Sequence, residues 1–307
     1  MVSDFAEFAR LSGFSSWDME TARGAQRLFH GRGQCYAGFE FFTVDYYEPV
    51  LWIVLYKEPG QEFWQDFCAA LENRFKNHCT AAVVQRRYEK PASATILWGL
   101  VPEKMAAIEG DCRFKLELAN NQNIGYFMDM EPTRRWLSKR ASGARVLNLF
   151  SYTCAFSVAA EQAGAVSIVN IDTSKSALAR GRENHNLNPS SQPAVVKFLS
   201  HDILKSWGRL KKLGPYDIVI CDPPSRQVGS FDAVRDYKKL VRQFPALLPL
   251  GGDVLVCLNA PYLGQGFLEE TMQTYCPSAT FIARIAGRED FPELNLDAAL
   301  KVLHYRL

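Results

Sequence analysis

The regular alternation of short apolar segments with amphipathic ones, which begins at Arg145, constrains the fold of this chain more than any other feature. Segments between the apolar ones, such as 157–164 and 174–188, carry apolar residues at helical spacing. Strands that alternate with helices of this length form βαβ units around a parallel sheet. We therefore predict an α/β fold with a doubly wound, mostly parallel sheet of seven strands. The seven strand candidates are 145–150, 167–172, 194–202, 216–222, 251–259, 279–285 and 300–307.

The first third of the chain has a different pattern. Aromatic-rich strand patterns at 39–47 and 49–57 precede a segment with helical spacing at 62–75. Further strand patterns follow at 81–88 and 94–100. This mixture predicts a small α+β domain before the α/β domain.

We place the small domain at residues 1–117 and the α/β domain at residues 118–307. The segment 118–144 joins them and contains a predicted helix, in which Pro132 suits a first-turn position. Residues 1–14 have the pattern of a short amphipathic helix and lack the basic and long apolar regions of a secretory signal.

Composition excludes several classes of protein. No apolar run reaches the roughly 18 residues that a membrane-spanning helix needs. The eight cysteines include no CxxC pair and no Cys/His cluster with zinc-ligand spacing, so we expect no metal site and a reducing, cytoplasmic location. Residues 1–120 carry a net charge of −3 and residues 121–307 one of +5. A mildly basic second part is compatible with a nucleic-acid substrate.

The carboxyl ends of the strands are where an open α/β sheet binds its ligands. Asp172 ends the second strand and is suited to accept hydrogen bonds from ribose hydroxyls, although it could be only a helix-entry residue. Asp202 follows the third strand and could accept from an adenine amino group or be a solvated turn residue. After the first strand, Ser151 and Thr153 stand where glycines might be, and no GxGxxG motif occurs. That absence argues against a bound pyrophosphate.

The segment VICDPPS at the end of the fourth strand is the most informative motif. Pro223 and Pro224 cannot donate backbone hydrogen bonds, and their fixed φ leaves Asp222 as an acceptor at the strand end. An acceptor-rich floor is suited to hold the amino group of a base. Asn259 lies at the carboxyl end of the fifth strand and could face the same region.

Together these motifs resemble the bacterial large-subunit (23S) ribosomal RNA methyltransferases that depend on S-adenosylmethionine (SAM) and make 5-methylcytosine or N7-methylguanine. The resemblance spans about residues 25–307. It implies a class I Rossmann-like methyltransferase with SAM as its cofactor and large-subunit ribosomal RNA (rRNA) as its substrate. The small domain would then be a possible RNA-binding domain. The matching segments are LFHGRG (28–33), VLWIVLYKE (50–58), GYFMDMEPTRRW (125–136), VLNLFSYT (146–153), IDTSKSAL (171–178), RENHNLN (182–188), CDPPS (221–225) and DAVRDYKKL (232–240).

The resemblance also implies residue roles. Asp222, Pro223 and Pro224 would form the junction between methyl donor and target base, and Asn259 would complete the catalytic set. Asp129 matches a position that the family keeps near the SAM pocket. The residues expected to bind SAM are Tyr126, Arg134, Phe150, Ser151, Asp172, Thr173, Asp202, Ile203 and Asp222.

Three departures from the family pattern bear on the substrate. Cytosine-modifying members have a nucleophilic Cys at the end of the fifth strand, where this chain has Asn259. Carbon-5 of cytosine needs covalent activation by a thiolate, whereas a guanine nitrogen already has a lone pair. Arg226 replaces a Phe on which a base could stack, and its guanidinium plane could serve instead. Before residue 25 we expect no further RNA-binding module.

The leading hypothesis is therefore methylation of a guanine nitrogen in rRNA. Cytosine-5 methylation with Cys257 as nucleophile remains an alternative, because alternation along the fifth strand puts Cys257 on the same face as Asn259. A SAM-binding protein that docks on RNA or the ribosome without catalysis, or a methyltransferase for small molecules or proteins, also remains open. The sequence gives no oligomeric state.

Overall fold

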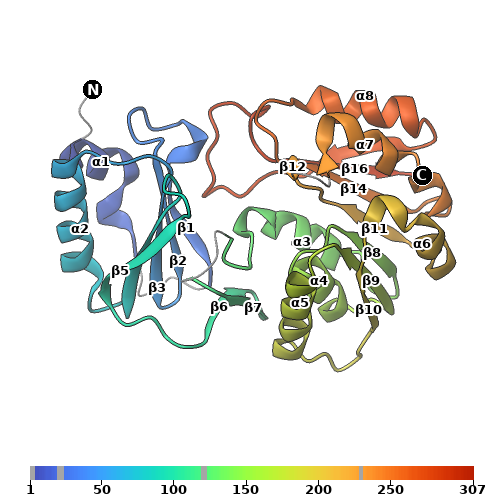
Figure 1. The fold of residues 1–307 in the computed structure, drawn as a ribbon, viewed down its shortest axis with the longest axis horizontal. Helices are drawn as coiled ribbons and strands as arrows, with labels where there is room; N and C mark the ends of the chain where they lie inside the picture. Colours follow the sequence, from blue (N-terminus) through green and yellow to red (C-terminus); the bar gives the residue numbers. More distant parts are fainter. Residues whose placement is uncertain (1–3, 19–23, 119–122, 228–230) are drawn as a thin grey trace. The chain divides into compact units, whose positions relative to one another are not determined.

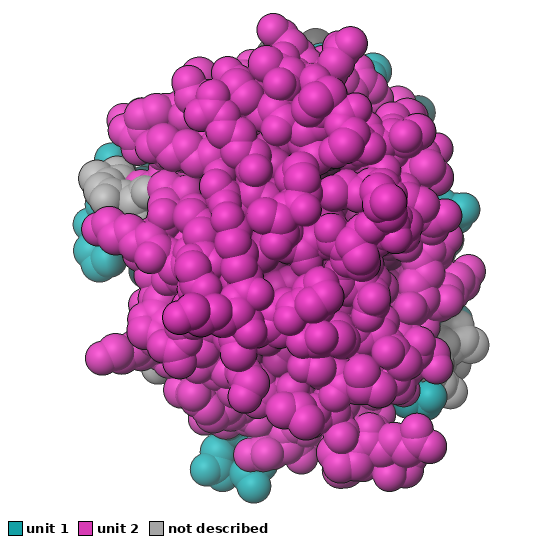
Figure 2. Space-filling view, turned by 90° about the vertical axis from the view of Figure 1, so that its right-hand side faces the viewer, with its two compact units in different colours: residues 1–128, 288–295 teal, residues 129–287, 296–307 magenta. Residues whose placement is uncertain are grey.

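The chain divides into two compact units. The computed structural model describes residues 4–18, 24–118, 123–227 and 231–307 (Figure 1). The first unit comprises Met1–Met128 with Arg288–Asn295, and the second comprises Asp129–Gly287 with Leu296–Leu307. Figure 2 colours them teal and magenta. The chain therefore passes from one unit to the other at three points. The assignment of functional domains to 1–117 and 118–307 stays a prediction.

The first unit is built on a five-stranded sheet in the order β1-β2-β3-β4-β5. All neighbours are antiparallel except β3 and β4, which are parallel and are connected by helix α2 (Gln61–Phe75). The strands predicted from the aromatic-rich patterns are confirmed, and β1 is an additional strand. Their bounds are β1 Gln26–His30, β2 Phe42–Tyr47, β3 Val50–Leu55, β4 Ala81–Arg86 and β5 Ser93–Gly99.

Aromatic side chains form the core between this sheet and its helices. Helix α1 (Phe5–Ser12) buries Phe8, whose ring centroid lies 5.0 Å from that of Phe29 and 5.5 Å from that of Phe67 on α2. Both helices cover the same face of the sheet (Figure 1). Burying such large rings supplies most of the driving force for this small unit. A hairpin of β6 (Met105–Glu109) and β7 (Cys112–Leu116), which the sequence reasoning missed, follows the sheet.

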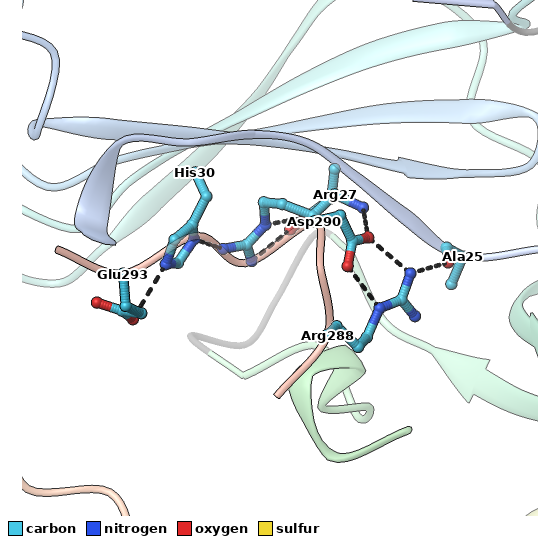
Figure 3. A network of polar contacts seen from close by, with 7 residues as sticks. Ala25, Arg27, His30, Arg288, Asp290 and Glu293 are labelled. Atoms are coloured by element: carbon cyan, nitrogen blue, oxygen red, sulfur yellow. Dashed lines mark hydrogen bonds and ion pairs between the residues drawn. The ribbon is translucent and has the colours of Figure 1, made fainter. Parts of the chain in front are cut away.

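Residues 288–295 belong to the first unit although they come from the end of the chain. Figure 3 shows how they are held. Asp290 accepts a hydrogen bond from the backbone N–H of Arg27 at 2.9 Å, and the N–H of Leu294 donates to the carbonyl of Gly33 at 2.8 Å. We call residues 288–295 the return segment. No local sequence pattern could predict these hydrogen bonds, because the partners of the return segment are about 260 residues away in the chain.

The second unit contains the predicted seven-stranded sheet, in the order β10-β9-β8-β11-β14-β16-β15. The five strands from β10 to β14 are parallel, and β16 is antiparallel to both of its neighbours. This confirms the α/β fold with a mostly parallel, doubly wound sheet. The strand bounds are β8 Arg145–Leu149, β9 Ser167–Asp172, β10 Val195–Ser200, β11 Ile218–Cys221, β14 Asp253–Leu258, β15 Thr280–Arg284 and β16 Lys301–Arg306.

Helices cover both faces of this sheet. One face packs against α3 (Glu131–Ser138) and α4 (Ala155–Gln162), with α5 (Lys175–Leu187) beside α4 (Figure 1). The other face packs against three further helices. Their bounds are α6 Trp207–Leu213, α7 Ala233–Val241 and α8 Gln265–Tyr275. The predicted helix start at Ser174 is confirmed, since its side chain caps α5 by accepting from the N–H of Ala177.

The connection between β11 and β14 is only partly helical. Helix α7 ends at Val241, and a 3-10 turn with Pro245 follows. Proline removes a backbone donor and so interrupts an α-helix. Gly251 adopts a φ of 85° in the turn that leads into β14.

Candidate active site

The site expected from the sequence lies in the second unit, at the carboxyl ends of β8 and β11. These two parallel strands are neighbours, yet the chain reaches β11 only after adding β9 and β10 on the far side of β8. The strand order therefore reverses between them. Such a switch point is where doubly wound sheets bind ligands. The turns that follow these strands, 150–154 and 222–225, therefore lie at the same end of the sheet.

The turn after β8 is strained without glycine. Phe150, Tyr152 and Cys154 have φ values of 58°, 46° and 62°. Left-handed backbone costs an ordinary residue roughly 1–2 kcal/mol. Hydrogen bonds hold the turn, from the N–H of Cys154 to the carbonyl of Ser151 (2.7 Å) and from the N–H of Ser151 to that of Ile171 (3.1 Å). Strain of this kind concentrates at functional sites.

Helix α5 packs against this turn and stabilises it. Asn184 donates to the carbonyl of Thr153 at 2.8 Å, and both residues are buried. A Cβ atom added at Gly181 would lie 2.5 Å from the Sγ atom of Cys154, so the helix backbone and the turn are in close contact. Glycines are absent from the turn itself, where Ser151 and Thr153 stand. The glycine that matters for packing here is Gly181, which allows α5 to approach the turn.

The hydroxyl group of Ser151 is a buried polar atom at this turn. It has no hydrogen-bond partner of ordinary geometry among the described residues, although the weakly polar thiol of Cys154 lies nearby. Burial of an unpaired hydroxyl is unfavourable, which favours a polar partner that binds here. Phe150 packs edge-on against Phe231, with ring centroids 5.2 Å apart. These features fit an adenosine-containing cofactor such as SAM.

Asp172 links the turns after β8 and β9. Its Oδ2 atom accepts from the N–H of Tyr152 at 2.9 Å, and its Oδ1 atom accepts from the N–H of Ser174 at 2.8 Å. The adjacent carbonyl of Thr173 accepts from Ser200 at 3.4 Å. Each carboxylate oxygen can accept a second hydrogen bond, so the predicted contact with ribose is compatible with this role. That contact, and the predicted part of Thr173, stay predictions.

Asp202 caps a short helix after β10. Its Oδ1 atom accepts from the N–H of Leu204 at 2.9 Å, and its side chain is 43% exposed. The neighbouring Ile203 is buried in the sheet core. Its Oδ2 atom forms an ion pair with Lys205 at 3.5 Å and can accept a further hydrogen bond, for example from an adenine amino group. The roles of Asp202 and Ile203 toward the cofactor stay predictions.

Asp222 has a strongly perturbed carboxyl group. Burial and the negative charge of Asp129 raise its pKa to about 7, while the guanidinium of Arg134 opposes both effects. Arg134 is itself only 1% exposed and lies on α3, with its guanidinium 5.9 Å from the ring of Phe156. The structure therefore brings Asp129, Arg134 and Asp222 into one electrostatic cluster. A carboxyl group that titrates near neutral pH is typical of functional sites.

Pro223 is buried and Pro224 is half-buried after Asp222. Arg226, where the resemblance led us to expect Phe, is exposed. Its backbone lies opposite Asp232 in the pairing of the two-residue strands β12 (Arg226–Gln227) and β13 (Phe231–Asp232). An exposed guanidinium at this position is available to a substrate.

Cys257 and Asn259 differ sharply in environment. Cys257 is 0% exposed, packs in the core with Leu255 and Val302, and burial raises the pKa of its thiol well above the ordinary value. A reactive cysteine needs an accessible thiol with a lowered pKa, so Cys257 is poorly suited to be a nucleophile. Asn259, just past β14, is exposed. Its catalytic role stays a prediction.

Tyr126, expected at the cofactor, belongs to the first unit. Its ring stacks on that of Phe114 with centroids 5.2 Å apart, and its hydroxyl donates to Glu109. Its role toward SAM stays a prediction.

A buried polar network beneath the site was missed by the sequence reasoning. Asn148 donates to Asn170 (3.0 Å), Asn170 donates to Ser157 (2.8 Å), and the His185 ring joins Ser157 (2.8 Å) to Glu161 (2.5 Å). It connects β8, β9, α4 and α5. Asparagines in the middle of two apolar strands were a visible signal, because a buried amide needs a partner.

Within residues 4–18, 24–118, 123–227 and 231–307, no group of three or more His, Cys, Asp or Glu side chains is arranged to hold a metal ion. In the same part of the chain, no helix has the length and apolar character to span a membrane.

Comparison with known proteins identifies relatives over nearly the whole chain. A family model described as S-adenosylmethionine-dependent methyltransferase matches residues 26–306. Ribosomal RNA large subunit methyltransferase K/L of Shewanella sp. (strain MR-4) is 36% identical over 164 residues, which are 51% of this chain and 23% of that protein. The chain thus spans about a quarter of that relative.

Two other relatives match over longer stretches. Ribosomal RNA large subunit methyltransferase I of Aeromonas hydrophila is 28% identical over 246 residues, 76% of this chain and 60% of its own length. A putative ribosomal RNA large subunit methyltransferase of Bacillus subtilis is 27% identical over 285 residues, 88% of this chain and 71% of its own length.

Among solved structures, a putative SAM-dependent methyltransferase from Streptococcus mutans has a TM-score of 0.83 at 24% identity, covering 100% of this chain and 82% of that one. A putative methyltransferase complexed with SAH has a TM-score of 0.81 at 24% identity, covering 98% of this chain and 79% of that one. These similarities confirm the Rossmann-like methyltransferase fold.

Proposed function

Because this chain belongs to the S-adenosylmethionine-dependent methyltransferase family, whose model matches residues 26–306, we propose that it methylates a guanine nitrogen in large-subunit rRNA. The RNA substrate is supported by the relatives named as large-subunit rRNA methyltransferases. A cytoplasmic location is part of the same proposal, since all eight cysteines are free.

The observation that carries the proposal is the placement of Asp222. Asp222 directly follows β11, the neighbour of β8, whose following turn is strained, and the pKa of the Asp222 carboxyl group is raised to about 7. When ionised, it can accept a hydrogen bond from an amino or imino group of a base. Pro223 and Pro224 present no backbone donor that would compete for the carboxylate. Asp222 would therefore orient the base rather than attack it.

Bound SAM supplies an electrophilic methyl group at this edge of the sheet. The residues of the chain then have to align a nucleophilic atom with it, and alignment alone can supply roughly 7–11 kcal/mol of the lowering of the barrier. A guanine ring nitrogen such as N7 carries a lone pair and needs no covalent help. The buried, weakly acidic thiol of Cys257 supports this choice over cytosine carbon-5.

The test is methylation in vitro with purified protein. Wild type would be incubated with isotopically labelled SAM and large-subunit rRNA from cells that lack the gene, and the digested nucleosides would be analysed by mass spectrometry. The expected product is a labelled methylguanosine, formed much more slowly with Asp222→Ala and at the wild-type rate with Asp111→Ala, which changes an exposed carboxylate in the first unit. Labelled 5-methylcytidine, or no label in RNA with folded protein that binds SAM, would contradict the proposal.

A further inference from the structure

The HGRG segment of the first unit has no part in the site described above. It forms the end of β1 and the 3-10 helix η2 (Gly31–Gly33). A Cβ atom at Gly31 would lie 2.0 Å from the carbonyl oxygen of Phe39, and one at Gly33 would lie 1.8 Å from that of Pro292. Both glycines are therefore required by close packing. Arg32 is the one residue between them, so its backbone is flanked on both sides by closely packed positions.

Arg32 is exposed and stacks on an aromatic ring. Its guanidinium carbon lies 4.5 Å from the centroid of Tyr56. Within the described part of the chain, its guanidinium makes no ion pair or hydrogen bond. A second guanidinium, that of Arg87, lies 5.6 Å from the same centroid and donates to Gln85 at 2.8 Å. Two cationic groups thus share one ring.

The fold brings Tyr56 and Arg87 together at the carboxyl ends of two neighbouring strands. Tyr56 directly follows β3 and Arg87 directly follows β4, and these two strands are parallel and paired. The backbone N–H of Arg87 donates to the carbonyl of Leu55 at 2.8 Å. Residues 1–120 carry 13 basic and 16 acidic residues, so this cluster is basic within an acidic part of the chain. A general excess of positive charge does not explain it.

We propose that Arg32, Tyr56 and Arg87 form a binding site for a single-stranded segment of the RNA substrate. The inference rests on the proposed function, because it takes RNA as the substrate. Guanidinium groups bind phosphates and their planes stack on unpaired bases, while the tyrosine ring holds both groups in orientation. A cation–π stack alone could be surface packing. The close-packed glycines on either side of Arg32 and its lack of another partner in the described chain favour a ligand.

The experiment measures RNA affinity by fluorescence anisotropy. Overlapping transcripts of large-subunit rRNA would be screened with wild type, and the tightest-binding one used for Arg32→Ala, Arg87→Ala and Arg32→Lys. We expect Kd to rise about tenfold for each alanine variant, and the salt dependence of log Kd to fall by about 0.7 for each phosphate that the variant no longer binds. Arg32→Lys should restore the salt dependence but only part of the affinity. Lys76→Ala, which removes an exposed charge after α2, should bind as wild type.

Steady-state kinetics distinguish a role in RNA binding from a purely structural role of these residues. The alanine variants should raise KM for RNA and leave kcat at saturating RNA and the Kd for SAM unchanged. Wild-type RNA affinity in folded Arg32→Ala and Arg87→Ala proteins would overturn the RNA-binding site while leaving the proposed function intact. Weaker binding to ribosomal subunits with unchanged binding to naked RNA would also overturn it, in favour of a protein partner. Failure of wild type to bind or methylate any rRNA would instead overturn the proposed function.

Discussion

Asp222 illustrates how a single carboxyl group acquires its chemistry from its neighbours. Burial and the charge of Asp129 both disfavour its ionised form, and Arg134 prevents the pKa from rising beyond about 7. Asp129 and Arg134 lie about 90 residues before Asp222 in the chain. Near neutral pH, Asp222 can thus exist in either protonation state.

The first prediction concerns removal of this carboxyl group. We expect Asp222→Ala to lower kcat by on the order of 100-fold, because the variant cannot form an oriented hydrogen bond to the reacting group. Binding of SAM, measured by calorimetry, should be largely retained, since the turn after β8 is intact. Wild-type turnover in this variant would contradict the role of Asp222.

The second prediction concerns pH. If ionised Asp222 accepts a hydrogen bond from the base, kcat should rise with pH through an apparent pKa near 7. The isosteric Asp222→Asn variant should lack this limb.

The same pKa affects stability in the opposite direction. The folded carboxyl has a pKa raised from 3.8 to about 7, so between these values only the folded state keeps the proton. The free energy of unfolding, measured with urea, should therefore fall as pH rises from about 4 to about 7. The decrease should be smaller in Asp222→Asn than in wild type. Equal slopes for both proteins would show that the group is not perturbed.

The third prediction concerns Cys257. Because its thiol is buried in the core with a raised pKa, Cys257→Ala should cost stability but retain methyl transfer within about threefold. The assay is product formation per folded, SAM-binding protein. Complete loss of activity in folded protein would restore the cytosine mechanism.

At the scale of elements, the turn after β8 depends on α5, the helix that follows β9. Phe150, Tyr152 and Cys154 adopt left-handed backbone, and Gly181 on α5 leaves just enough space for Cys154. Hydrogen bonds from Asn184 and to Asp172 keep the turn in this conformation. The conformation of this turn therefore depends on β9 and α5 as well as on its own sequence.

The fourth prediction tests this dependence. Gly181→Ala should raise the Kd for SAM about tenfold, because its Cβ atom would lie 2.5 Å from the Sγ atom of Cys154 and displace the turn. In an unconstrained helix the same change would stabilise by about 1 kcal/mol. Gly208→Ala on α6 is the matched control, since nothing lies within 4 Å of its Cβ position. If both variants bind SAM equally well, the turn is not held by α5.

The strands were largely predictable at this scale, because hydrophobic periodicity is a local signal. Helix α6 was missed since Trp207–Leu213 is only seven residues long, and α8 was missed because Gly264 and Gly266 flank its start. The left-handed turn could not be predicted, since non-glycine residues rarely adopt that backbone. Asp222 was singled out from the DPP motif, and Asp129 and Arg134 from the family resemblance, but the electrostatic interaction between them becomes visible only in the fold.

At the scale of the whole molecule, the chain returns to the first unit late in its course. Asp290 holds the return segment in place (Figure 3). It accepts a hydrogen bond from the backbone N–H of Arg27 and two from the guanidinium of Arg288, the latter at 2.7 and 2.6 Å. His30 approaches Glu293 at 3.3 Å in the same network. Long-range closure of this kind leaves no trace in local sequence patterns.

The fifth prediction concerns this closure. Asp290→Ala should destabilise the first unit by about 1–3 kcal/mol, because a backbone donor and a guanidinium lose their acceptor. Urea unfolding followed by tryptophan fluorescence would report it, with Asp111→Ala as the exposed control. An unchanged midpoint in Asp290→Ala would mean that the return segment adds no stability.

The central claim is methylation of a guanine nitrogen in large-subunit rRNA, and nucleoside mass spectrometry of that RNA from cells with and without the gene tests it most directly. The account predicts one methylguanosine that disappears in the deletion and returns with the wild-type gene, but not with Asp222→Ala. Loss of 5-methylcytidine instead, or an unchanged set of modified nucleosides, would contradict it.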